Sequence, residues 1–242
     1  MLEQELDYER NAFLMLNGGH SPFEDQFFWL FSGKIVWIPV VLVFIAVLFY
    51  RNKNHWKETL LMLLAIVLVI TFCDQFVSGF CKPFFHRFRP THHPEFMNDV
   101  QTVFNYRGGK YGFISGHAAN GFGFLTFTAF IFRYKIYTFA VFLWAAITAY
   151  SRIYLGVHFI SDIIGGIFAG VFIGWIMYRL YILAYNKLII NKLTFKIQEN
   201  GCFIYPRKNI DIILYTLALT VAFIFFVSAL YSSHFIKAIT IK

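Results

Sequence analysis

Three groups of polar residues stand at the ends of long apolar runs, where such side chains are costly unless they serve a function. They comprise Lys82 and Arg89, then Ser115-Gly116-His117, then Ser151-Arg152 with His158 and Asp162. Lysine and arginine can bind a phosphate group. Histidine, oriented by aspartate, can transfer it. The three groups therefore point to phosphoryl chemistry.

The cations predict a binding site for an anion. Lys82, Arg89 and Arg152 carry positive charges, and the planar fork of arginine matches the oxygens of a phosphate group. Ser115-Gly116-His117 opens a predicted helix, whose free N–H groups and positive dipole end also favour an anion. We expect these residues to form a phosphate cradle.

The histidines supply the reacting groups. His158 and Asp162 are four residues apart, so on a helix they share a face and the carboxylate can bond one imidazole nitrogen. That bond fixes the tautomer and leaves the other nitrogen free to attack. His117 is a second imidazole, suited to protonate a departing oxygen.

The elements that would position these residues are six apolar runs. The runs cover residues 35–50, 59–80, 113–132, 136–156, 159–183 and 211–231. About 20 residues of helix span a hydrocarbon core, and lipid cannot satisfy an open backbone, so each run predicts a transmembrane helix. Residues 8–31 predict an interfacial helix interrupted by a loop at 17–22. The expected fold is an all-α, polytopic membrane bundle of about six transmembrane helices with an N-terminal interfacial helix.

The order of the crossings explains how distant residues can meet. If every run crosses the membrane once, the end of the second run, the start of the third, the end of the fourth and the start of the fifth lie on one face. The three polar groups occupy these four places. We therefore expect one site, with its motifs at 82–162, in a single membrane-embedded domain over residues 1–242.

Composition supports a membrane protein. Hydrophobic residues make up 58% of the 242 residues and charged residues 14%, whereas about 25% is usual in soluble domains. The net charge of +8 could suggest nucleic acid, but the basic residues cluster at the ends of the apolar runs, where they meet lipid headgroups. We expect membrane lipids and no nucleic acid as partners, and the sequence does not predict the oligomeric state. The three cysteines are expected to be free thiols.

The distribution of lysine and arginine predicts the orientation. Apart from Lys82, Arg89 and Arg152, seven such residues lie on the face of the polar groups and eleven on the opposite face. In membrane proteins the cytoplasmic loops carry more lysine and arginine, so the face with eleven of these residues is expected in the cytoplasm. The site is then expected at the periplasmic or external face of a bacterial inner membrane. Residues 184–210 would form the one long cytoplasmic connection, either a small hairpin turning at Asn200-Gly201 or a basic segment on the inner leaflet.

Four further polar residues have other interpretations. Asp74, inside the second run, is expected to have a structural partner on a neighbouring helix rather than a catalytic role. Arg87 is interpreted as solvated or interfacial. Arg107 and Lys110 could contact the headgroup of a substrate or lie in a solvated loop.

The spacing of the three groups resembles the signature of the type-2 phosphatidic acid phosphatase superfamily, also called lipid phosphate phosphatases. The matching pattern is Lys82-x6-Arg89-Pro90, Ser115-Gly116-His117 and Ser151-Arg152-x5-His158-x3-Asp162. It spans residues 82–162, a third of the chain. The resemblance implies that the phosphoryl group is bound by Lys82, Arg89, Ser115, Gly116 and Arg152. It implies further that His158 is the nucleophile, that Asp162 orients it and that His117 is the general acid.

The resemblance also bears on cofactors and on one departure from the pattern. It implies that no metal ion and no cofactor take part. Ile114 stands where the family usually has proline before Ser-Gly-His. The replacement is expected to loosen the loop without removing a reacting group.

The function implied by the resemblance is removal of phosphate from a lipid phosphate or diphosphate through a phosphohistidine intermediate. Candidate substrates are a lipid A phosphate, undecaprenyl diphosphate, phosphatidylglycerol phosphate and phosphatidic acid. The cations and aromatic residues of loop 91–112 suit a sugar-phosphate headgroup and favour the lipid A phosphatase branch. A lipid phosphotransferase would use the same residues. The alternative from another class is a membrane scaffold or transporter with a relic anion site.

Overall fold

The computed structural model describes residues 2–50, 56–190 and 205–240, and each of the six apolar runs folds as helix. The helical elements are α1 (Leu2–Asn17), α2 (Pro22–Ser32), η1 (Ile35–Trp37), α3 (Ile38–Phe49), α4 (Trp56–Asp74), η3 (Gln75–Cys81), α5 (Lys82–Phe85), η4 (Pro90–His92), α6 (Gly116–Phe132), α7 (Lys135–Tyr154), α8 (Ile160–Leu188) and α9 (Arg207–Thr240). In the described loops, Phe88 and Tyr111 form an isolated β-bridge. The all-α prediction is confirmed, and the long apolar helices identify an integral membrane protein.

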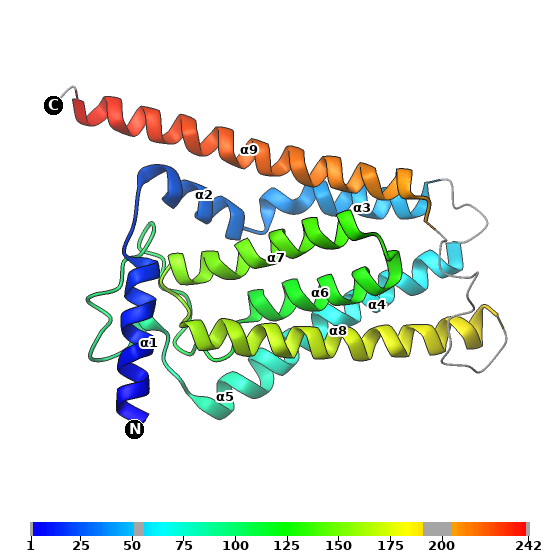
Figure 1. The fold of residues 1–242 in the computed structure, drawn as a ribbon, viewed down its shortest axis with the longest axis horizontal. Helices are drawn as coiled ribbons and strands as arrows, with labels where there is room; N and C mark the ends of the chain where they lie inside the picture. The colour runs from blue at the N-terminus through cyan, green and yellow to red at the C-terminus, as the bar shows by residue number, and fades with distance from the viewer. Residues whose placement is uncertain (1, 51–55, 191–204, 241–242) are drawn as a thin grey trace.

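Helix α6 lies at the centre of the bundle. It packs against α4, α7 and α8, and these helices run side by side along the long axis (Figure 1). Its side chains Ala118, Ala119 and Phe127 are fully buried. The contact with α8 is close, because a Cβ at Gly166 would lie 2.5 Å from the carbonyl oxygen of Ser115. This contact fixes the start of α6 against the start of α8.

The number of membrane crossings is close to the prediction. Four helical stretches are long and apolar enough to span a membrane, namely Trp56–Phe85, Lys135–Tyr154, Ile160–Leu188 and Arg207–Ser233. Helix α2 and the segment Ile35–Phe49 would form a fifth span, bent by 66°. Helix α6 has 17 residues, at the lower limit for a span, and its neighbours enclose it. The predicted six helices are present, whereas length and composition alone support four or five spans.

The N-terminal segment forms two helices with different surroundings. The break between them falls at residues 18–21, within the predicted loop, where Ser21 caps α2 and Pro22 occupies its first position. Figure 1 shows α1 crossing the end of the bundle, whereas α2 packs against α9. Only the first half of the predicted interfacial segment therefore has the geometry expected of an interfacial helix.

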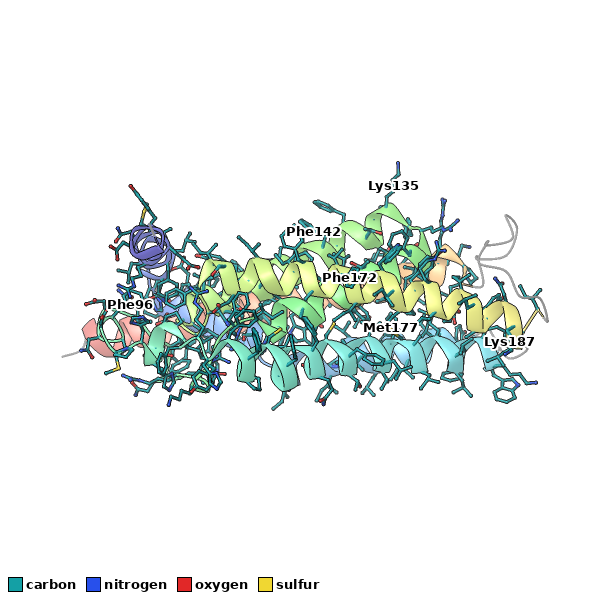
Figure 2. All side chains as sticks on the ribbon, turned by 90° about the horizontal axis from the view of Figure 1, so that it is seen from below. Phe96, Lys135, Phe142, Phe172, Met177 and Lys187 are labelled. Atoms are coloured by element: carbon teal, nitrogen blue, oxygen red, sulfur yellow. The ribbon has the colours of Figure 1, made fainter. Side chains whose placement is uncertain are left out.

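The two ends of the bundle carry different elements. Figure 2 shows Phe96, from the loop between α5 and α6, at one end and Lys187 of α8 near the other. The starts of α6 and α8 and the end of α7 lie at the loop end, as the crossing order predicts. Helix α8 includes residues up to Leu188, and the hairpin or basic segment predicted beyond it falls at 191–204, outside the described residues. Cys73 and Cys81 are free and buried, while Cys202 also lies outside the described residues.

Candidate active site

The three polar groups meet at the loop end of the bundle. They come from the start of α5 (Lys82), the first turn of α6 (His117), the last turn of α7 (Arg152) and the first turn of α8 (Asp162). His158, just before α8, interacts electrostatically with Lys82, Arg89 and Arg152. His117 interacts with His158 and with both arginines. The structure therefore brings two imidazoles and three cations into one cluster, as the sequence predicts.

Asp162 holds the buried imidazole of His158. Nδ1 of His158 lies 3.2 Å from Oδ2 of Asp162, and the same oxygen accepts a hydrogen bond from the N–H of Phe159 at 3.0 Å. This geometry arises because Asp162 is the third residue of α8, from which a carboxylate reaches back to the residue before the helix. With the Nδ1 proton directed at Asp162, Nε2 presents its lone pair.

Arg89 faces the other nitrogen of the imidazole. Its Nη1 lies 3.1 Å from Nε2 of His158 and donates to the carbonyl oxygen of Val157 at 3.0 Å. Gly108 lies against the guanidinium group with a φ of +67°, and a Cβ there would come within 3.2 Å of Nη1. The loop before α6 thus covers Arg89, and a glycine permits both the backbone conformation and the close approach.

The environment of His158 keeps its imidazole neutral. Burial lowers the pKa of His158 well below its ordinary value of 6.5, and Arg89, Arg152 and Lys82 lower this pKa further. A neutral imidazole retains the lone pair that a nucleophile needs, whereas an imidazolium has none to offer. The cations that the sequence assigns to phosphate binding therefore also keep this imidazole unprotonated.

Arg152 is buried and held by residues that the sequence did not single out. Its Nη1 donates to the hydroxyl of Ser32, and its Nη2 donates to the hydroxyl of Tyr106 at 3.4 Å. The guanidinium carbon also lies 5.7 Å from the centre of the Tyr106 ring. Among the described residues the buried Nε of Arg152 has no hydrogen-bond partner, which leaves a donor for an anion.

An irregular stretch of helix positions Lys82. At Gln75, α4 passes into the π-helical segment η3, which alters the direction in which the following side chains point. Lys82 follows directly and lies close enough to Arg89 and Arg152 to interact with both charges. Asp74, at the end of α4, accepts a hydrogen bond from the side chain of Asn120 on α6 at 2.8 Å, which is the structural pairing expected for it.

Ser115 and Gly116 begin α6. The hydroxyl of Ser115 accepts a hydrogen bond from the N–H of Ala118 at 3.4 Å, and its own N–H donates to the carbonyl oxygen of Asp162 at 2.9 Å. Ser115 thus acts as a helix cap, and contact of Ser115 and Gly116 with phosphate stays a prediction. Ile114 is buried, and a Cβ at Gly165 would lie 2.6 Å from it, so packing opposes the expected loosening of the loop.

Arg107 and Lys110 lie in the loop that covers Arg89 and not in the cluster. Both are exposed, and the ammonium of Lys110 lies 5.4 Å from the ring centre of Phe88 and 5.5 Å from that of Tyr111. A surface position beside the cluster is compatible with contact to a headgroup. That role stays a prediction.

The interpretation of Arg87 as a solvated or interfacial residue is wrong. Its Nη1 donates to Oδ1 of Asp162 at 3.0 Å, and its Nη2 donates to Oε2 of Glu9 at 2.6 Å. Sequence reasoning missed this link because it depends on α1 folding back onto the start of α8, a contact between residues far apart in the chain. The one available signal was the position of Arg87 inside the first motif.

The side chains of the cluster are not grouped as the ligands of a metal ion would be. Across the part of the chain that the structure describes, no three histidine, cysteine, aspartate or glutamate residues are grouped to hold a metal ion. Asp162 and His158 instead bond each other and backbone or arginine N–H groups.

Comparison with known proteins identifies related sequences. The profile of the PAP2 superfamily matches residues 62–186. A lipid A 4'-phosphatase of Porphyromonas gingivalis is 48% identical over 186 residues, which cover 77% of this chain and 78% of that protein. A lipid A 4'-phosphatase of Bacteroides thetaiotaomicron is 36% identical over 230 residues, covering 92% of this chain and 96% of that protein.

A solved structure shares the fold. The crystal structure of a transmembrane PAP2-type phosphatidylglycerolphosphate phosphatase from Bacillus subtilis superposes with a TM-score of 0.56 at 20% identity. The superposition covers 77% of this chain and 88% of the other. At this identity the similarity concerns the arrangement of the helices.

Proposed function

The chain belongs to the PAP2 superfamily, and we propose that it is a membrane phosphatase that removes the 4'-phosphate of lipid A. Two relatives that carry this name support the substrate, one of them matched over 92% of this chain. The observation that carries the proposal is the contact between Nδ1 of His158 and Asp162 at 3.2 Å, with Arg89 facing Nε2. This is the arrangement that a histidine nucleophile beside a phosphate cradle requires.

In the proposed reaction, Nε2 of His158 attacks phosphorus in line with the bond to the leaving oxygen. The P–N bond forms as the P–O bond breaks, and His117 donates a proton to the departing oxygen. A water molecule then attacks the phosphohistidine, with His117 as the base that accepts its proton. Inorganic phosphate leaves, and both imidazoles return to their starting states.

The cations bind and stabilise the phosphoryl group. Lys82, Arg89 and Arg152 would neutralise its oxygens as charge redistributes during transfer, which is the main source of rate in phosphoryl-transfer enzymes. Arg89 would exchange its contact with Nε2 for a phosphate oxygen, and the unpaired Nε of Arg152 offers a further donor. Because these side chains supply the positive charge, the reaction needs no metal ion.

The same proposal places the substrate relative to the membrane. The acyl chains remain in the outer leaflet, the site opens at the periplasmic face of a bacterial inner membrane, and Arg107 and Lys110 contact the sugar-phosphate headgroup. The location of the cluster at one end of the bundle supports this placement, because a lipid headgroup lies at that depth. The chain would act as a single domain over residues 1–242.

Other lipid substrates and other classes of membrane protein have less support. The Bacillus subtilis phosphatase shares the helical arrangement at 20% identity, which does not extend to its substrate. A phosphotransferase would use the same residues but would need a second lipid as acceptor. A scaffold or transporter gives no reason for His158 to pair with Asp162 beside three cations.

The test is phosphate release by the purified protein in detergent. Wild-type protein should release inorganic phosphate from lipid A, and His158→Ala should lower the rate by at least about 10³-fold because it removes the nucleophile. His117→Ala should lower it by about 10²–10⁴-fold because the leaving oxygen then departs without a proton.

The matched control is His55→Ala, which changes a histidine that no motif includes. No release by the wild type from lipid A, or equal rates for His158→Ala and His55→Ala, would contradict the proposal. Phosphatidylglycerol phosphate and undecaprenyl diphosphate, assayed in parallel, test the choice of substrate. Phosphate that appears on a second lipid instead of in solution would identify a transferase.

A further inference from the structure

Arg87 joins the first motif to two carboxylates. Its Nη1 donates to Oδ1 of Asp162 at 3.0 Å and to the hydroxyl of Ser161, and its Nη2 lies 2.6 Å from Oε2 of Glu9. The Arg87 side chain is 24% exposed, that of Glu9 18% and that of Asp162 0%. This set of contacts is partly buried and uses both Nη1 and Nη2 of the guanidinium group, unlike an ordinary surface ion pair.

Glu9 completes the link from α1 to the start of α8. Its second oxygen, Oε1, accepts a hydrogen bond from the N–H of Ser161 at 2.8 Å. The guanidinium of Arg87 also lies 4.6 Å from the ring centre of Phe159, which in turn packs on Phe13 of α1 at 5.5 Å. The first helix is therefore fastened to the residues on either side of Asp162 by charge and by packing.

Asp162 needs a partner on each of its oxygens. Oδ2 is used by His158 and by the N–H of Phe159, and Oδ1 is used by Arg87. If Arg87 moved away, Oδ1 would be left in a buried position without its donor, which is costly and allows the carboxylate to rotate. Rotation would misdirect Oδ2 and with it the imidazole of His158.

We propose that Arg87 and Glu9 are positioning residues that hold Asp162 in the orientation that presents Nε2 of His158 to phosphorus. Glu9 keeps Arg87 in place, Arg87 keeps Asp162 in place, and α1 is thereby part of the catalytic structure. Neither residue belongs to the phosphate cluster, so their contribution is to the chemical step and not to binding. The inference rests on the proposed function.

Arg10 provides a matched control on the same helix. It lies next to Glu9 and, like Arg87, its side chain is 24% exposed. It pairs with Asp7 and Glu95 and also contacts His93 and the ring of Phe96. Arg10→Gln therefore removes the charged contacts of a similarly buried arginine on α1, none of which involves Arg87 or Asp162. A general loosening of α1 would affect both variants, whereas the proposed link is broken only by Glu9→Gln.

The experiment compares Glu9→Gln, Arg87→Lys, the double variant and Arg10→Gln, with lipid A as the substrate. Glu9→Gln keeps an oxygen for Ser161 but loses the charge, and Arg87→Lys keeps the charge but cannot reach both carboxylates. Each single variant should lower kcat by about 10–100-fold, because a small misplacement of a reacting group has effects of that size. The KM for lipid A and the inhibition constant of inorganic phosphate should stay within about twofold of wild type.

The double variant tests whether the two residues act through one chain of contacts. Its kcat should equal the kcat of the less active single variant, since breaking either contact already releases Asp162. Multiplied losses, a kcat for Glu9→Gln equal to that of Arg10→Gln, or a phosphate inhibition constant that rises as kcat falls would each overturn the inference. Active wild type with unaffected variants overturns the inference alone, whereas inactive wild type overturns the proposed function and the inference with it.

Discussion

In the proposed mechanism, His158 and His117 must meet opposite demands within one cluster. A nucleophilic imidazole must be neutral, whereas a general acid must carry a proton when the leaving group departs. His158 meets its demand through burial, through the cations around it and through Asp162 on its Nδ1. His117, in the first turn of α6, lies close enough to His158 and both arginines to interact with them. A bound phosphate would place negative charge beside it and favour the proton it must donate.

The lowered pKa of His158 predicts the acidic side of the pH profile. A histidine whose pKa lies below 6.5 is deprotonated already at mildly acidic pH, so the active form persists to lower pH than an ordinary histidine would allow. The acidic limb of kcat/KM should therefore have its midpoint below pH 6.5. A ³¹P titration of the lipid is the control for ionisation of the substrate phosphate. A limb centred at or above pH 6.5 that the lipid does not share would contradict the prediction.

At the residue scale, the sequence predicted the groups that carry charge and missed those that hold them. Lys82, Arg152 and His158 could be placed together because their spacing and the order of crossings leave little freedom. Ser32 and Tyr106 could not be found, since a serine or tyrosine carries no sign that it will bond Arg152. Such contacts depend on how loops pack, and periodicity carries no information about that.

At the scale of elements, the contact between α6 and α8 sets the geometry of the site. His117 sits on the first turn of α6, and Asp162 on the first turn of α8, so the distance between the helices fixes the distance between their side chains. Gly166, Gly170 and Gly174 line one face of α8 and allow its backbone to approach that of α6. In a membrane, small residues at four-residue spacing are a common means of bringing two helices close.

Gly170→Ala should therefore harm both stability and activity. A Cβ at Gly170 would collide with the carbonyl oxygen of Ala119 and approach the N atom of Gly123 to 2.9 Å, so the helices would have to separate. We expect a loss of about 1–3 kcal/mol in stability, from thermal unfolding in detergent, and at least a tenfold loss of phosphate release.

Gly19→Ala makes the same change where a Cβ would meet nothing within 4 Å, and it should leave both quantities unchanged. Wild-type stability and activity in Gly170→Ala would show that the close approach is not required.

The prediction of elements succeeded where the signal is a long apolar run and failed at irregular backbone. The six runs became helices because lipid and the bundle core both require an apolar surface over many residues. The π-helical segment Gln75–Cys81 carries no comparable signal, since it differs from α-helix only in hydrogen bonds that span one more residue. The central place of α6 was also not visible, because a buried helix and a lipid-facing helix have similar composition.

At the scale of the whole molecule, the site cluster and the basic residues outside it are unevenly distributed between the two ends. The cluster and the loop before α6 occupy one end, and basic residues such as Lys135 and Lys187 lie toward the other (Figure 2). The excess of lysine and arginine in short loops marks the cytoplasmic side. An outward-facing site would receive a lipid from the outer leaflet, with its headgroup at the depth of His158.

This orientation predicts which residues a reagent outside the membrane can reach. Gly109 is exposed beside the site, and a side chain there would enter open space, so Gly109→Cys should be tolerated. Lys187→Cys offers a matched exposed position toward the other end. Both are made with Cys202→Ser, because Cys73 and Cys81 are buried and Cys202 lies outside the described residues.

In spheroplasts, a membrane-impermeant maleimide should label Gly109→Cys at once and Lys187→Cys only after the membrane is opened. Phosphate release by each labelled preparation confirms that the protein is folded. The opposite pattern would place the site in the cytoplasm and would require substrate from the inner leaflet, because the headgroup of a lipid reaches only the face on which it lies. Labelling of both positions in sealed spheroplasts would contradict a fixed orientation, since the two ends are separated by the length of α8.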